Sequence, residues 1–195
     1  PSISFRHFAG DADYALILSM FMESTRADGM TESATLEGIR SWCAPSARFD
    51  PARDLIIAMS TAPGGEARPV GFSRLGWYTG PGDTHLYDQD SYMLPEARAH
   101  GLWPLLLRRG EHRLVEIAAG HPTPARRFYQ GWATASQAEW IATLEKTHGL
   151  RFMTWIAPQT FGDPAFPGLL AGDFSYMDLS DPAALAEWEK RMKLQ

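Results

Sequence analysis

The sequence has a single cysteine, Cys43, so its 195 residues can form neither an intrachain disulfide nor a zinc site built from several cysteines. No run of about 18 apolar residues is present to span a membrane, and no basic-plus-apolar segment typical of a secretion signal opens the sequence. Basic runs are absent as well, and the formal net charge is −5, which disfavours nucleic acid as a partner. We therefore expect a cytoplasmic protein without membrane or nucleic-acid partners.

Several catalytic patterns are also missing. His and Glu do not occur at the spacing of a known metal site, so no metal is expected. There is no Gly-x-Ser-x-Gly elbow and no evident Cys-His pairing for nucleophilic catalysis. What the chain does have is 45% hydrophobic residues with seven tryptophans, which is enough for a substantial core.

The first half of the chain reads mainly as strands. Residues 3–8 alternate apolar and polar positions, and residues 55–59, 69–78 and 84–94 are further strand-like runs separated by Pro/Gly turns. Between the first two of these runs we expect two helices, one opening at Asp11 and one capped by Thr31. Three consecutive strands with short turns predict an antiparallel meander, and therefore an α+β or mixed α/β fold.

The rest of the chain is organised around residues 91–120. There a strand passes through a loop into a helix, with Pro104 in a first-turn position where its missing N–H is tolerated. A loop at a helix N-terminus is a ready anion site, because free amides and the positive dipole end face the ligand. In that loop Gly101 would let a phosphate approach the backbone closely, and Arg98 and His100 could add charge.

Residues 94–107 resemble the acetyl-CoA loop of the GNAT N-acetyltransferases. The order is an aliphatic-Pro-Glu strand end, then Arg98-x-x-Gly101-Leu102, then a Leu-rich helix. The family pattern is Gln/Arg-x-x-Gly-x-Gly/Ala, so Arg98 and Gly101 match and Trp103 replaces the third fixed residue. The resemblance implies an α+β fold with a central mixed sheet of about seven strands flanked by about four helices. By element order it covers residues 1–179, with residues 180–195 as a C-terminal helical extension.

Beyond the central helix, residues 127–133 predict a strand parallel to its predecessor, because a helix joins the two. A capping box at Ser136 then starts a helix that stops at Gly149. Strands are expected at 151–157 and 174–179, with a long loop at 158–172 between them. The helix after Asp181 could cover the domain's own sheet or a second subunit, as in a homodimer.

The resemblance also implies an activity. It implies acetyl-CoA as co-substrate, an amine of a small molecule or peptide as acceptor, and direct transfer between them. The loop between the first two helices would help bind the acceptor. Backbone amides of the strand end would hold the acetyl and pantetheine groups, and those of the following loop would hold the phosphates. The residues expected to bind acetyl-CoA are Tyr92, Met93, Leu94, Arg98, Ala99, His100, Gly101, Leu102 and Trp103.

For the general base we favour Asp90, which shares one strand face with Asp88 by the period of two. If partly buried, each carboxylate would raise the pKa of the other; the alternative is a solvated strand edge. For the general acid we favour Tyr129, with Tyr176 as the alternative. We expect the indole of Trp103 to turn outward and pack, rather than to obstruct the phosphates.

Two other functions stay open on the sequence alone. The helix at 136–148 lacks the Asn and Tyr usual in the family, and Trp103 departs from its pattern. Both features would suit a catalytically degenerate GNAT-like module that acts as a CoA sensor or interaction domain. The remaining alternative is a binding scaffold that does not use CoA.

Overall fold

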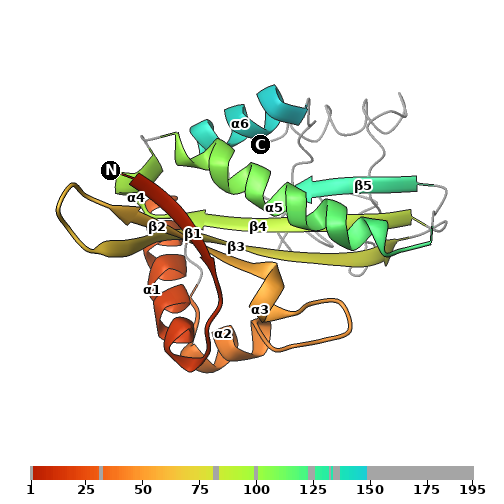
Figure 1. Ribbon diagram of the computed structural model, residues 1–195, viewed down its shortest axis with the longest axis horizontal. Coiled ribbons are helices and arrows are strands. Elements are labelled where there is room, and N and C mark those ends of the chain that lie inside the picture. The colour runs from red at the N-terminus through yellow and green to blue at the C-terminus, as the bar shows by residue number, and fades with distance from the viewer. Residues whose placement is uncertain are drawn as a thin grey trace, which may run out of the picture. The chain divides into compact units, whose positions relative to one another are not determined.

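The structure is a computed structural model that describes residues 2–30, 33–80, 84–98, 101–122, 126–131, 133 and 137–148. Within these ranges the chain forms five strands and six helices (Figure 1). In chain order the elements are β1 (Ser2–His7), α1 (Asp11–Ala27), α2 (Leu36–Trp42), α3 (Pro51–Asp54), β2 (Leu55–Thr61), β3 (Ala67–Gly80), β4 (Thr84–Met93), α4 (Pro95–Arg98), α5 (Leu102–Ala119), β5 (Arg126–Gly131) and α6 (Ala138–His148). The elements predicted beyond residue 150, and the domain boundary after residue 179, lie outside the described residues.

The five strands form one sheet in which each strand lies beside its neighbour in the sequence, in the order β1-β2-β3-β4-β5. Neighbours from β1 to β4 are antiparallel, whereas β5 runs parallel to β4. A parallel pair needs a crossover connection, which α5 supplies. The predicted meander, the parallel strand after the central helix and the mixed α+β class are therefore confirmed.

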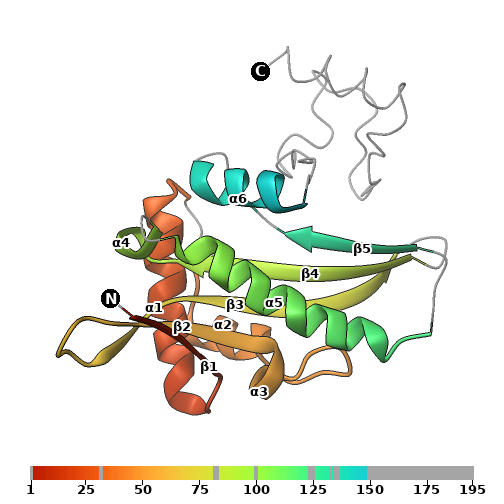
Figure 2. The same ribbon diagram turned by 45° about the horizontal axis from the view of Figure 1, so that its top comes forward.

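Helices cover both faces of this sheet (Figures 1 and 2). Helices α1 and α2 pack on one face and α5 on the other, with α6 beside α5. The core between the sheet and α1/α2 is apolar; its buried members include Ile17, Met20, Ile39, Leu55, Ile57 and Phe72. Each such side chain stabilises the fold by about 1.5–3 kcal/mol. No helix within the described ranges is long and apolar enough to cross a lipid bilayer.

The starts of the first two helices agree with the sequence prediction to different degrees. Helix α1 begins after Gly10, and Asp13 in its first turn binds the Arg6 guanidinium through both carboxylate oxygens. Helix α2 begins at Leu36, where the Thr35 hydroxyl accepts the N–H of Gly38 at 3.0 Å. The cap expected at Thr31 is therefore wrong: Thr35 is the residue that occupies the N-cap position of this helix.

Candidate functional site

Helix α5 begins at the glycine of the loop motif. Gly101 is the N-cap residue and adopts φ of 65°, in the left-handed region that favours glycine. The next two residues, Leu102 and Trp103, are 0% and 2% exposed, so their side chains belong to the core and only their backbones can meet a ligand. Ala99 and His100 lie outside the described residues.

The indole of Trp103 stacks on Trp140 of α6, with the ring centroids 4.7 Å apart and the planes at 25°. Of the two arrangements considered for this side chain, packing against the fold is the one observed. The sequence could not identify the partner, which comes from a helix far along the chain. At this position the large residue joins α5 to α6.

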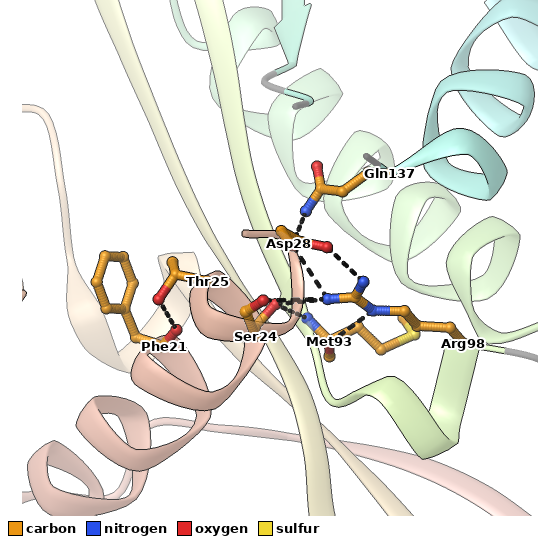
Figure 3. Close-up of polar contacts among 7 residues, drawn as sticks. All are labelled: Phe21, Ser24, Thr25, Asp28, Met93, Arg98 and Gln137. Carbon is orange, nitrogen blue, oxygen red and sulfur yellow. Dashed lines mark hydrogen bonds and ion pairs between the residues drawn. The ribbon is translucent and has the colours of Figure 1, made fainter. Parts of the chain in front are cut away.

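Arg98 also has an internal role (Figure 3). Its two Nη groups donate to the two carboxylate oxygens of Asp28, and its Nη2 donates to Ser24 Oγ at 3.1 Å. Its Nε donates to the carbonyl of Met93 at 3.1 Å. Gln137, just before α6, donates to the same Asp28 carboxylate at 2.6 Å. The arginine of the loop motif therefore ties together the end of α1 and the end of β4.

The pairing of strands β4 and β5 ends before β4 itself ends. Their parallel pairing stops at Gln89 and Gly131, whereas β4 continues to Met93. Because the N–H of Leu94 donates to Val70 on β3, the alternation of the ladder directs the backbone groups of Ser91 and Met93 to the edge that β5 has left. At this divergence the edge of β4 pairs with no other strand in the described part of the chain.

The two backbone positions on this edge differ in what they bind. The N–H of Met93 donates to Ser24 Oγ at 3.3 Å, and its carbonyl accepts from Arg98. Ser91 instead lines a pocket, and its hydroxyl is turned to the opposite face, where it bonds Ser73. Of the backbone amides predicted to hold the acetyl and pantetheine groups, those of Met93 and Leu94 already donate hydrogen bonds within the protein. The backbone of Ser91, which was not among the predicted residues, is better placed to bind a ligand. Ser91 could have been identified only from which residues of β4 direct their backbone hydrogen bonds toward β3.

The pocket at this divergence has a volume of about 600 Å³. It extends from the end of α1 and the α1–α2 connection across α2 to β4 and the residues before α6. Its lining residues are Phe21, Asp28, Met30, Ser33, Ala34, Thr35, Gly38, Ile39, Trp42, Asp90, Ser91, Tyr92, Ala133 and Gln137. The α1–α2 connection, expected to help bind an acceptor, therefore forms part of the wall.

One wall of the pocket is aromatic. The rings of Phe21 and Tyr92 lie 4.9 Å apart, and Trp42 is edge-on to Tyr92 at 6.1 Å. Behind them Phe72 stacks on Tyr92 at 5.1 Å and fixes the orientation of that ring. Aromatic contacts at these distances are stabilising beyond the area that they bury. Phe21, Trp42 and Tyr92 are called the aromatic wall below.

Two carboxyl groups lie on the same face of β4 as Tyr92. Asp90 lines the pocket, and Asp88 lies two residues before it with its Oδ1 buried and without a hydrogen-bond partner in the described part of the chain. Burial raises the pKa of Asp90 to about 6, and burial together with the charge of Asp90 raises the pKa of Asp88 to about 8. The shared face was predicted, and the buried Asp88 oxygen does not suit a solvated strand edge.

A cation also lies near this pair. Arg74 on β3 is opposite Asp90 in register, and its charge works against the rise in pKa of both aspartates. Its Nε donates to the Trp42 carbonyl at 3.1 Å, and its guanidinium lies 4.2 Å from the Phe49 ring centroid. Among the described ion pairs, which extend to 4.0 Å, none joins Arg74 to either aspartate.

Tyr129 lies on the other face of the sheet. Its hydroxyl donates to Gln89 Oε1 at 3.1 Å, and the Gln89 amide donates to the Leu106 carbonyl of α5. Burial is the largest cause of the raised pKa of Tyr129. Since side chains alternate along β4, Gln89 and Asp90 point to opposite faces, so the structure does not bring Tyr129 and Asp90 together. Its role as the general acid stays a prediction.

Comparison with known proteins connects this geometry to a fold. No family model matches the sequence, and no curated protein matches it either. A GCN5-related N-acetyltransferase from Sphaerobacter thermophilus shares 20% identity at a TM-score of 0.57; the match covers 74% of this chain and 42% of that one. The chain thus spans less than half the length of that protein.

Two further solved structures match over most of both chains. The first is yncA from Salmonella typhimurium with its cofactor acetyl-CoA, which shares 16% identity at a TM-score of 0.52 over 80% of this chain and 89% of that one. The second is a transcriptional regulator from Bacillus halodurans C-125, with 11% identity and a TM-score of 0.56 over 80% and 98%. Identities this low establish the architecture alone: the chain has the fold of the GCN5-related N-acetyltransferases.

Proposed function

We propose that the protein is an N-acetyltransferase that moves an acetyl group from acetyl-CoA directly to an amine of a small molecule or peptide. One observation carries the proposal. Where β4 and β5 diverge, a backbone edge at Ser91 and the carboxyl of Asp90 line the same pocket. Acyl transfer to an amine needs both kinds of group, since the acyl oxygen must be polarised and the amine must lose a proton.

The residues at the start of α5 fit the phosphates of acetyl-CoA. A Cβ added to Gly101 would meet no atom within 4 Å, so the backbone there is open to a ligand. The amides of Gly101, Leu102 and Trp103 begin a long helix whose dipole favours an anion. In this arrangement Arg98 holds the strand end in place through Met93 and leaves the phosphates to the amides. The ligand supplies an activated thioester.

Within the pocket each residue has a defined task. Asp90 accepts the proton of the acceptor's ammonium group, and its raised pKa makes it a stronger base than an exposed aspartate. The N–H of Ser91 donates to the acyl oxygen as negative charge develops there. The departing sulfur also needs a proton; Tyr129 could supply it only by releasing Gln89.

The test is release of free thiol from acetyl-CoA over a panel of amines, with wild-type protein and Gly101→Val. The variant places a β-branched side chain at a positive φ and beside the phosphates, so we expect acetyl-CoA affinity measured by calorimetry to fall at least about tenfold. Circular dichroism checks that the variant is folded. Unchanged affinity in a folded variant would remove this loop from the site.

A second candidate function is a CoA-binding sensor without catalysis. The helix at 136–148 supports it, because that helix lacks the Asn and Tyr that the GNAT pattern usually has there. The similarity to the Bacillus halodurans regulator is compatible with it. Acetyl-CoA at 100 times its dissociation constant should stabilise either kind of protein by about 2.7 kcal/mol. Thermal stabilisation without thiol release from any amine would favour the sensor.

A further inference from the structure

In the part of the chain that the structure describes, the lining of the pocket carries almost no net charge apart from one side chain. Its described lining contains two ionisable residues of acidic type, Asp28 and Asp90, and none of basic type. The charge of Asp28 is balanced inside the protein by Arg98, and Gln137 donates to the same carboxylate. Asp90 has no ion-pair partner within 4.0 Å among the described residues. Among the residues that the structure describes, Asp90 is therefore the one anionic contact that the pocket offers to a ligand.

Opposite this contact the pocket is apolar. The aromatic wall presents three half-buried rings, and Met30 and Ile39 extend the apolar surface. Such a surface gains free energy by burying hydrocarbon and also attracts an ammonium group through the ring faces. A volume of about 600 Å³ leaves room for a small organic molecule and lies within the range of pockets that bind compact ligands.

We infer that the acceptor is a small monoamine with an aryl or alkyl body and without a carboxylate or phosphate group. Its ammonium group contacts Asp90, and its apolar body lies on Phe21, Trp42 and Tyr92. This assignment rests on the proposed acetyltransferase function, because it names the substrate class of the same site.

Other amine classes fit the lining less well. A diamine would place its second ammonium beside Asp28, whose charge Arg98 already balances, or against the aromatic wall, where the attraction of the rings offsets only part of the cost of desolvating an unpaired charge. An amino acid would bring its carboxylate near Asp90, and the described lining of the pocket contains no cation to receive it. Arg74 does not fill that need, since the Trp42 carbonyl and the Phe49 and Trp42 rings hold its guanidinium.

The reaction balances for a primary monoamine. One ammonium proton passes to Asp90 and then to solvent, and the freed nitrogen attacks the thioester carbon. The C–N bond forms as the C–S bond breaks, and the second proton of the nitrogen goes to the sulfur. The products are an N-substituted acetamide and the free thiol.

The experiment compares matched probes by calorimetric binding and by thiol release with acetyl-CoA. The probes are 2-phenylethylamine, 2-phenylethanol without the charge, phenylalanine with an added carboxylate, and hexylamine against 1,6-diaminohexane. We expect 2-phenylethylamine to bind at least about tenfold more tightly than 2-phenylethanol or phenylalanine, and hexylamine to be preferred over the diamine by a similar factor.

Two variants assign the preference to the pocket. Asp90→Asn should weaken 2-phenylethylamine about tenfold or more and leave 2-phenylethanol nearly unchanged. Phe21→Leu should weaken the aryl amine more than hexylamine, since it removes a ring from the aromatic wall. Glu66→Gln is the matched control, because Glu66 is an exposed carboxylate in the turn between β2 and β3.

The outcomes separate the inference from the proposed function. Thiol release with phenylalanine or the diamine equal to that with the monoamines would overturn the inference and leave the acetyltransferase standing. Selective binding of the monoamine without thiol release from any amine would reject the acetyltransferase function. The preference of the pocket for monoamines would then still stand. Absence of binding by all the amines, in protein whose circular dichroism shows it to be folded, would overturn the inference.

Discussion

The two faces of strand β4 differ in whether their buried polar side chains have hydrogen-bond partners. On the α5 face, the Gln89 amide bonds Ser73, Ser91 and the Leu106 carbonyl, and its oxygen accepts from Tyr129. On the α1/α2 face, the neighbouring Asp88 has a buried oxygen without a described partner. Because successive side chains alternate, residues one step apart in the sequence enter these two environments.

The difference separates the part of the molecule that fixes the sheet from the part that is expected to bind substrate. A buried polar network in which the members are bonded fixes one arrangement of strand and helix. A buried carboxyl group that lacks a partner destabilises the fold, and its altered pKa is typical of a site that a ligand completes. The α5 face therefore holds β4 in place, while the α1/α2 face is the one expected to meet substrate.

The largest effect should come from filling the α5 face. A Cβ on Gly110 would overlap the Gln89 side chain, with Nε2 only 2.6 Å away. Gly110→Ala should therefore lower the free energy of unfolding by about 3 kcal/mol, measured by urea denaturation, although alanine favours helix. In a Gln89→Ala background the same change should cost less than about 1 kcal/mol. An equal cost in both backgrounds would show that the close approach is not the cause.

The next effect concerns catalysis on the opposite face. Asp90→Asn should lower the turnover number about 100-fold, or 2.7 kcal/mol, with little change in acetyl-CoA affinity. The wild-type rate should rise with pH as Asp90 ionises, since its pKa is raised to about 6, and the variant should lose that inflection. A wild-type rate and pH profile in the variant would exclude Asp90 as the base.

A smaller effect is expected on stability from Asp88→Asn. The pKa of Asp88 is raised from 3.8 to about 8, so folding favours the neutral acid. Its contribution is fully present below pH 3.8 and is lost as pH rises through 8. Because Asn stays neutral, the variant should gain stability relative to wild type over this window, by at least about 1.4 kcal/mol at its upper end. A difference that does not vary with pH would contradict the assignment.

The smallest effect should come from Tyr129→Phe. Removing the hydroxyl breaks its bond to Gln89 and should lower the free energy of unfolding by about 1 kcal/mol. The geometry predicts that thiol release is retained, since Tyr129 lies on the face opposite Asp90. Loss of turnover in a variant as stable as the wild type would instead support Tyr129 as the general acid.

Local patterns were enough to predict most of the described fold. A continuous apolar run located β2, strand-like runs bounded by turn residues located β3 and β4, and the helical connection predicted that β5 is parallel to β4. The same period of two predicted that Asp88 and Asp90 share a face. What these signals have in common is that each depends on residues close together in the sequence.

The remaining features of the site depend on pairs that are distant in the sequence. Arg98 and Asp28 are 70 positions apart, and Gln137 is 109 positions from the same aspartate. The loop motif gave no indication that its arginine would bind inside the protein. Similarly, the direction of the Ser91 backbone groups depends on the register between β3 and β4. The spacing of residues along one strand carries no information about that register.

The strand order has a consequence for how the molecule is assembled. β2, β3 and β4 are joined by short connections and pair in sequence, so closing these contacts costs little chain entropy. The pocket instead brings together residues from Phe21 to Gln137, and its last wall is synthesised after the whole meander. During translation the three-stranded meander can therefore form while the site is still incomplete. The described lining of the pocket is complete only once Gln137, just before α6, is in place.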